Sequence, residues 1–182
     1  MALTRLGPNQ AVNLSTNTTG NLNLASQVTG TLATGNGGTG ATSFAPGKVG
    51  QVVVTETTGN ISTTSTSLAA TGFIASITPS ATTSKVLVFI AGGKLTNGPG
   101  TGRIDAHIYS QTGGGGYSDL FKFVDDNNQA GDTFGQTVSG AELHTTNTTS
   151  QVDYQVYIKV NSGTVYLNND SQLTITMMEI LA

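Results

Sequence analysis

The chain of 182 residues contains no cysteine and no tryptophan, and only 9% of its residues are charged. Without cysteine it can form neither a disulfide scaffold nor a Cys-ligated zinc site, and we expect it to fold in a reducing cytosol. No apolar run approaches the roughly 20 residues of a membrane-spanning helix, so membrane insertion is not expected. Seven Lys and Arg residues spread along a chain of net charge -3 do not favour nucleic acid as a partner.

The first 45 residues offer little that could form a core. Residues 6–47 contain no charged side chain and one aromatic residue, Phe44. Their apolar residues are small or isolated, and such a segment buries too little surface to fold alone. We therefore predict an extended N-terminal arm over residues 1–45 that orders on a partner or on other copies, with a disordered tail as the alternative.

Residues 46–182 form the predicted head domain. Nearly half of the chain is Thr, Gly, Ser or Asn, and short segments rich in β-branched residues recur between turn residues. No segment has a convincing helical period. The pattern predicts an all-β fold, a jelly-roll-like antiparallel sandwich. The predicted strands are 51–56, 62–69, 73–78, 85–91, 103–110, 117–124, 134–144, 151–160, 164–168 and 172–181.

Two of these strands are apolar on both faces. Residues 86–91 are apolar throughout, and the C-terminal strand has large apolar residues on each of its faces. Because a sandwich buries only one face of each sheet, the other face must be covered by a loop, by the arm or by another subunit. We favour another subunit and therefore predict self-association. Its predicted interface residues are Val86, Val88, Ile90, Ile175, Met177 and Met178.

The chain carries no recognisable catalytic motif. The glycine-rich run 35–40 lacks the preceding strand and following helix of a dinucleotide site. His107 and His144 are the only histidines, and we interpret both as ordinary strand residues, with metal binding by symmetry-related copies of His107 as a minor alternative. We therefore expect a non-enzymatic protein without cofactor or metal.

Residues 125–132 form an acidic stretch with three aspartates. It matches a calcium loop at too few ligand positions, so we interpret it as a solvated loop, with a weak calcium site as the alternative. A glycan hydrolase with paired carboxylates is a further alternative, although no pair stands out. Its candidate acids are Asp119, Asp125, Asp126 and Asp132.

Several segments resemble bacteriophage virion proteins. Residues 30–42 resemble a run of phage tail fibres with the pattern Gly-Thr-Leu-Pro-Val-Ala-Asn-Gly-Gly-Thr-Gly, and depart from it at Ala33, Thr34 and Gly35. The rest resembles a C-terminal β domain of virion proteins from cyanophages and marine phages. The matching segments are 46–53, 62–67, 77–80, 84–88, 162–169 and 173–180. The resemblance implies a trimeric virion structural protein with a jelly-roll head, and it implies no catalytic residues.

The residues and the resemblance together predict a tail fibre or baseplate appendage, made in the host cytoplasm and built into the virion. The arm would attach to other virion proteins, and loops at one end of the sandwich would contact the host surface, with a surface glycan as partner. The predicted contact residues are Tyr117, Asp125 and Asn128. Because 182 residues is short for a fibre, a capsid decoration protein that cements the head is the alternative.

Overall fold

The structure is a computed structural model that describes residues 48–97, 102–126 and 135–181, and it confirms the predicted all-β class. No residue in these ranges is helical. The predicted arm over residues 1–45 lies outside them and stays a prediction. The ten strands are β1 (Val49–Thr57), β2 (Ile61–Thr63), β3 (Ala69–Ile77), β4 (Lys85–Asn97), β5 (Ile104–Thr112), β6 (Ser118–Asp126), β7 (Gly135–Thr145), β8 (Val152–Val160), β9 (Val165–Leu167) and β10 (Leu173–Ile180).

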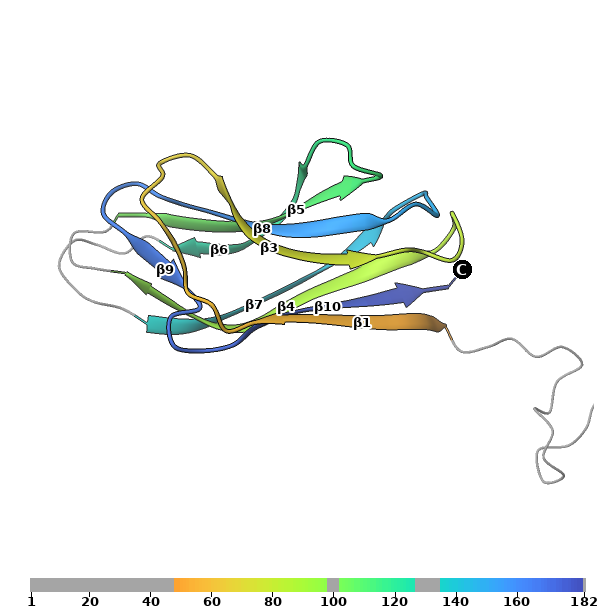
Figure 1. Ribbon diagram of the computed structural model, residues 1–182, viewed down its shortest axis with the longest axis horizontal. Coiled ribbons are helices and arrows are strands. Elements are labelled where there is room, and N and C mark those ends of the chain that lie inside the picture. The colour runs from red at the N-terminus through yellow and green to blue at the C-terminus, as the bar shows by residue number, and fades with distance from the viewer. Residues whose placement is uncertain (1–47, 98–101, 127–134, 182) are drawn as a thin grey trace, which may run out of the picture. The chain divides into compact units, whose positions relative to one another are not determined.

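The strands form two antiparallel sheets that stack face to face (Figure 1). Sheet A has the order β1-β10-β4-β7; the short β9 pairs with β4 beyond the end of β10, and β2 pairs with β9. Sheet B has the order β3-β8-β5-β6. The eight long strands change sheet at every connection except the β5–β6 hairpin, which is the two-sheet arrangement of a jelly roll.

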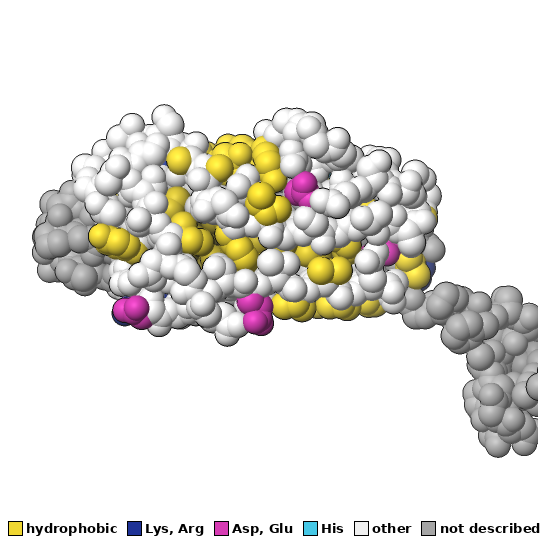
Figure 2. All heavy atoms as spheres, viewed as in Figure 1, with side chains coloured by type: hydrophobic (Ala, Val, Ile, Leu, Met, Phe, Trp, Pro, Cys, Tyr) yellow, Lys and Arg dark blue, Asp and Glu magenta, His cyan; other side chains and the backbone are white. Residues whose placement is uncertain are grey.

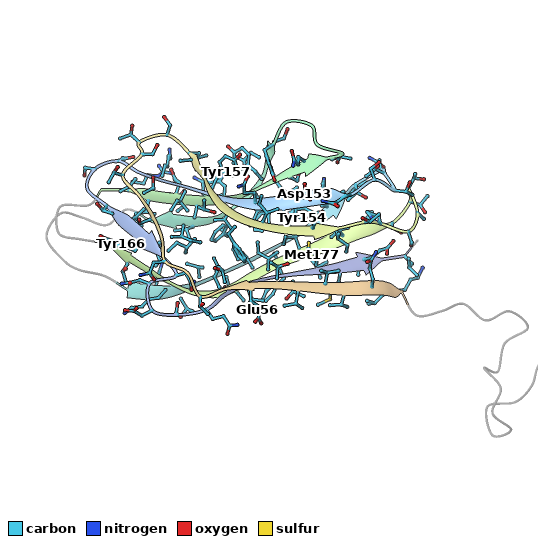
Figure 3. The ribbon with its side chains drawn as sticks, viewed as in Figure 1. Glu56, Asp153, Tyr154, Tyr157, Tyr166 and Met177 are labelled. Carbon is cyan, nitrogen blue, oxygen red and sulfur yellow. The ribbon has the colours of Figure 1, made fainter. Side chains whose placement is uncertain are left out.

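Alternate side chains of the two sheets fill the space between them. Tyr154 of β8 and Met177 of β10 point into this space from opposite sheets (Figure 3), and both are fully buried. The alternation predicted for residues 151–160 and 103–110 is confirmed. The inward-facing residues of these two strands are Val152, Tyr154, Val156, Ile158 and Val160 on β8, with Ile104, Ala106 and Ile108 on β5.

Strand β4 continues past a bulge that the sequence suggested as its end. Gly92 and Gly93 have φ angles of 83° and 64°, which residues with a side chain rarely adopt. A Cβ atom on Gly92 would lie 2.3 Å from the Gln172 carbonyl oxygen, so this close approach to the chain before β10 requires glycine. The bulge shifts the register with β7 between Gly92 and Lys94, and the strand then runs on to Asn97.

Two buried carboxylates link neighbouring segments of the chain. Asp105 accepts ion-pair contacts from Arg103 at 3.1 Å, Lys122 at 3.2 Å and Lys159 at 2.9 Å. Burial alone would raise the pKa of Asp105, but hydrogen bonds from these cations outweigh burial and lower it to about 2.

Glu179 makes the second buried cluster, at the end of β10. Its Oε1 accepts hydrogen bonds from the amide and the hydroxyl of Ser80, both at 2.6 Å, and its Oε2 accepts one from the Gln51 side chain at 2.8 Å. Burial would raise the pKa of Glu179, but these hydrogen bonds lower it to about 2. The carboxylate thereby links β10 to β1 and to the chain that follows β3.

These two carboxylates predict the acid limit of stability. A carboxyl group whose folded pKa is depressed contributes stability above its unfolded pKa and loses it as the pH falls towards the folded pKa. Asp105 and Glu179 should each contribute about 2 to 3 kcal/mol at neutral pH that disappears between about pH 5 and pH 2. Chemical denaturation across this range checks the slope. The Glu179→Gln variant should be less stable at pH 7 and less sensitive to acid; an unchanged acid slope would contradict the assignment.

Candidate functional site

An apolar surface crosses all four long strands of sheet A on its outer side. Val52 of β1 pairs with Met178 of β10, which pairs with Leu87 of β4, which pairs with Leu143 of β7. Two residues along these strands, on the same face, Val54 of β1 and Phe89 of β4 flank Thr176 of β10. Side chains opposite each other on neighbouring strands lie about 5 Å apart, so these rows are continuous. We call this surface the outer apolar patch; it comprises Val52, Val54, Leu87, Phe89, Leu143 and Met178.

The patch is open to solvent in a single copy of the chain. Val52 and Val54 are 54% and 52% exposed, Phe89 is 40% and Leu143 is 46% exposed. Figure 2 shows hydrophobic side chains along the lower border, on the outer side of β1. A contiguous exposed apolar surface of this kind is typical of an interaction site.

The interface prediction is wrong for five of its six residues. Val86, Val88 and Ile90 of β4 have no exposed surface, and neither have Ile175 and Met177 of β10. Their side chains fill the core between the sheets, so they cannot contact another copy. Met178 alone lies on the outer face. The patch is instead formed by the other face of the same strands, through Leu87 and Phe89.

The structure separates the predicted receptor residues. Tyr117 directly precedes β6, whereas Asp125 lies near the far end of that nine-residue strand. At about 3.3 Å a residue, the two are roughly 26 Å apart, so they cannot belong to one end of the sandwich. Asp125 pairs instead with Arg103 at 2.8 Å and with Lys122 at 3.2 Å. Asn128 lies outside the described residues, as do residues 127–132 of the candidate calcium loop.

Tyr117 belongs to a group of aromatic side chains on the outer face of sheet B. Tyr109 of β5 stacks on Tyr157 of β8, with ring centroids 4.1 Å apart and planes inclined by 25°. Tyr117 tilts against Tyr157 at 6.0 Å. We call these three residues the tyrosine cluster. Sequence reasoning selected Tyr117 but missed the other two, although Tyr109 and Tyr157 stand on the polar faces of their alternating strands.

Charged and amide groups surround the tyrosine cluster. On one side, Asp153 accepts hydrogen bonds from Ser76, Gln111 and Gln151 at 2.6 to 2.9 Å. On the other side, Asp119 lies 2.9 Å from Nδ1 of His107. Burial and the neighbouring carboxylates raise the pKa of two cluster hydroxyls, with Asp119 acting on Tyr109 and Asp153 on Tyr117. A carboxylate therefore lies near each of these two hydroxyls.

The two candidate hydrolase acids whose side chains the structure describes, Asp119 and Asp125, do not form a catalytic pair. Asp119 and Asp125 stand six residues apart on β6, or about 20 Å, whereas a glycosidase holds its two carboxyl groups within about 10 Å. The Asp126 side chain and Asp132 fall outside the described part of the chain. Among the described residues, no group of three or more His, Asp or Glu side chains could hold a metal ion. The same residues include no helix with the length and apolar content that crossing a bilayer requires.

Comparison with known proteins yields a likeness in fold only. No protein-family model matches the chain, and no curated protein matches it in sequence. The similar solved structures include that of infectious bursal disease virus, Gt strain, with 14% identity, a TM-score of 0.42 and coverage of 74% of this chain and 39% of that chain. The VP2 protein of the same virus in T=1 particles gives 13% identity, a TM-score of 0.40 and coverage of 74% and 37%. The chain thus spans about two fifths of the length of these proteins.

Proposed function

We propose that this protein is a non-enzymatic structural component of a bacteriophage virion, a homotrimeric tail fibre or baseplate appendage that contacts the host surface. The outer apolar patch is the observation that carries the proposal. A jelly roll whose outer sheet face is apolar across four strands is built to be covered in an assembly. The segments that resemble phage virion proteins, and the order in which they follow one another in the sequence, support the same role.

A second copy of the chain is the occupant that we assign to the patch. Its centre carries no charged residue, so identical faces do not repel each other. Lys85 lies at one end of the outer face and Glu56 lies towards the other, and contact between copies can bring these opposite charges together. The number of copies, three, comes from the resemblance to trimeric virion proteins.

The length of the chain favours one other function, that of a capsid decoration protein. In that case the arm would lie across capsid subunits and the outer apolar patch would rest on the capsid rather than on other copies. The two functions share the virion and differ in where the protein is mounted.

Electron microscopy of purified virions that carry a labelled copy tests the proposal. Label at the tail or baseplate is the expected result. Label spread over the head would establish the decoration function instead. Virions without label, from infected cells that contain the labelled protein, would overturn both functions.

The arm should be needed for attachment to the virion but not for folding of the head. A chain that begins at Pro46 should keep the described sandwich, because the core residues that the structure describes all lie after that point. It should fail to enter virions when it competes with the full chain during infection. Circular dichroism and immunoblots of purified particles check the two parts. An unfolded truncated protein, or one that enters normally, would show that the boundary near Pro46 is misplaced.

A further inference from the structure

The tyrosine cluster lies in a hollow on the outer face of sheet B. The hollow is bounded by the chain between β2 and β3 and by the β5–β6 hairpin, and Figure 2 shows hydrophobic side chains exposed between these two raised segments. Figure 3 places Tyr157 and Asp153 on this side of β8, away from the core. The cluster is thus separate from the outer apolar patch, which belongs to the other sheet.

The hollow combines flat aromatic faces with unpaired polar atoms. Tyr109, Tyr117 and Tyr157 are each only partly buried, although three large rings gather there. The Tyr117 hydroxyl is buried and has no hydrogen-bond partner among the described residues, and the same holds for Nε2 of His107, whose side chain is 9% exposed. His107 lies beside Tyr109, with ring centroids 6.3 Å apart. Buried polar atoms are normally hydrogen-bonded, so these two are exceptions among the described residues.

This combination fits a sugar ring. The face of an aromatic ring carries partial negative charge and attracts the slightly positive C–H groups on the apolar face of a pyranose. Carboxylates accept hydrogen bonds from sugar hydroxyls, and side-chain amides both accept and donate them. Beside the tyrosine cluster, Asp153 and Asp119 supply carboxylates and Gln111 supplies an amide. An apolar floor with a few placed polar groups is the usual form of a small-molecule site.

The charge around the cluster selects the kind of sugar. Asp119 and Asp153 lie beside the rings. Asp105 and Asp125 hold the cations Arg103, Lys122 and Lys159 in ion pairs. An acidic sugar would meet two carboxylates without a free cation. We propose that the tyrosine cluster binds neutral or amino-sugar residues of a bacterial surface polysaccharide. This inference rests on the proposed function, in which the protein contacts the host surface.

An array of bacterial surface polysaccharides, probed with the full chain, tests the inference. Binding to neutral or amino-sugar glycans and not to uronic-acid polymers is expected. Tyrosine fluorescence gives the affinity in solution, because the chain has no tryptophan and three of its five tyrosines form the cluster. Tyr157→Ala should weaken binding about tenfold or more. The matched control is Tyr166→Ala, which removes a tyrosine that is 39% exposed on β9 and should leave binding unchanged.

Three outcomes would overturn the inference: no neutral or amino-sugar glycan bound, preference for acidic glycans, or binding that Tyr157→Ala leaves unchanged while the variant stays folded. Failure here is distinct from failure of the proposed function. If the labelled protein is found at the virion tail but binds no glycan, the structural role stands and only the glycan site is refuted. If the protein binds glycan but is missing from virions, the glycan site stands and the virion role is refuted.

Discussion

The Phe89→Asp variant should be a folded monomer, whereas we expect the unmodified protein to form the proposed trimer. Phe89 is 40% exposed in a single copy, so a carboxylate there leaves the sandwich intact. In the assembly it would be buried without a partner in the centre of the outer apolar patch. The cost of about 3 kcal/mol per contact weakens association by a factor of about a hundred. Light scattering at micromolar concentration measures the mass, and circular dichroism confirms the fold.

The control for this variant is Ile74→Asp. Ile74 is 41% exposed and lies on β3, in the other sheet. The variant therefore places the same charge at an equally exposed apolar position away from the patch. It should assemble normally. A monomeric unmodified protein, or equal effects of Phe89→Asp and Ile74→Asp, would contradict the assignment of the patch to self-association.

The Ile175→Asp variant should not fold at all. Ile175 has no exposed surface and faces the core from β10, beside Ile90 of β4. An unpaired carboxylate there costs several kcal/mol, which is a large part of the 5 to 15 kcal/mol that stabilise a typical domain. Loss of the β-sheet signal in circular dichroism and recovery of the protein only in aggregates are the expected results.

The neighbouring variant Thr176→Asp separates the two faces of β10. Thr176 pairs with Val54 and Phe89 on the outer side of sheet A. This variant should fold and fail to assemble, in contrast to Ile175→Asp. If the two adjacent variants behaved alike, the division between core face and outer face would be wrong.

All ten strands were predicted from the sequence, because alternating apolar residues and turn residues are local signals. The errors occur where geometry depends on distant contacts. Residues 62–69 were predicted as one strand, but β2 ends at Thr63 and the chain crosses to sheet B before β3 begins at Ala69. The predicted strand 85–91 stopped before Gly92, whose positive φ makes a bulge rather than an end.

The interface prediction shows a limit of single-sequence reasoning. A period of two reveals which residues share a face of β4, but when both faces are apolar it cannot reveal which face meets the core. Val86 and Val88 look as suitable for an interface as Leu87 and Phe89. Strand β10 held a usable signal, because the threonines Thr174 and Thr176 mark its mixed face as the outer one.

The tyrosine cluster could be predicted only in part for a similar reason. The sequence singles out Tyr117 because it follows a run of glycines. Tyr109 and Tyr157 stand 48 positions apart, and only the pairing of β5 with β8 brings their rings into contact. Asp125 was grouped with Tyr117 because both lie near turn residues, although a nine-residue strand separates the turns.

Thiol labelling of a single introduced cysteine tests most directly whether other copies cover the outer apolar patch. The chain has no cysteine, so Leu143→Cys on the patch and Ile74→Cys on the other sheet each provide one reactive site. Leu143 and Ile74 are 46% and 41% exposed in a single copy. We expect a maleimide to label position 74 rapidly and position 143 slowly in the assembled protein, with position 143 becoming fast when Phe89→Asp is added. Equal, rapid labelling of both positions in the unmodified background would contradict the account.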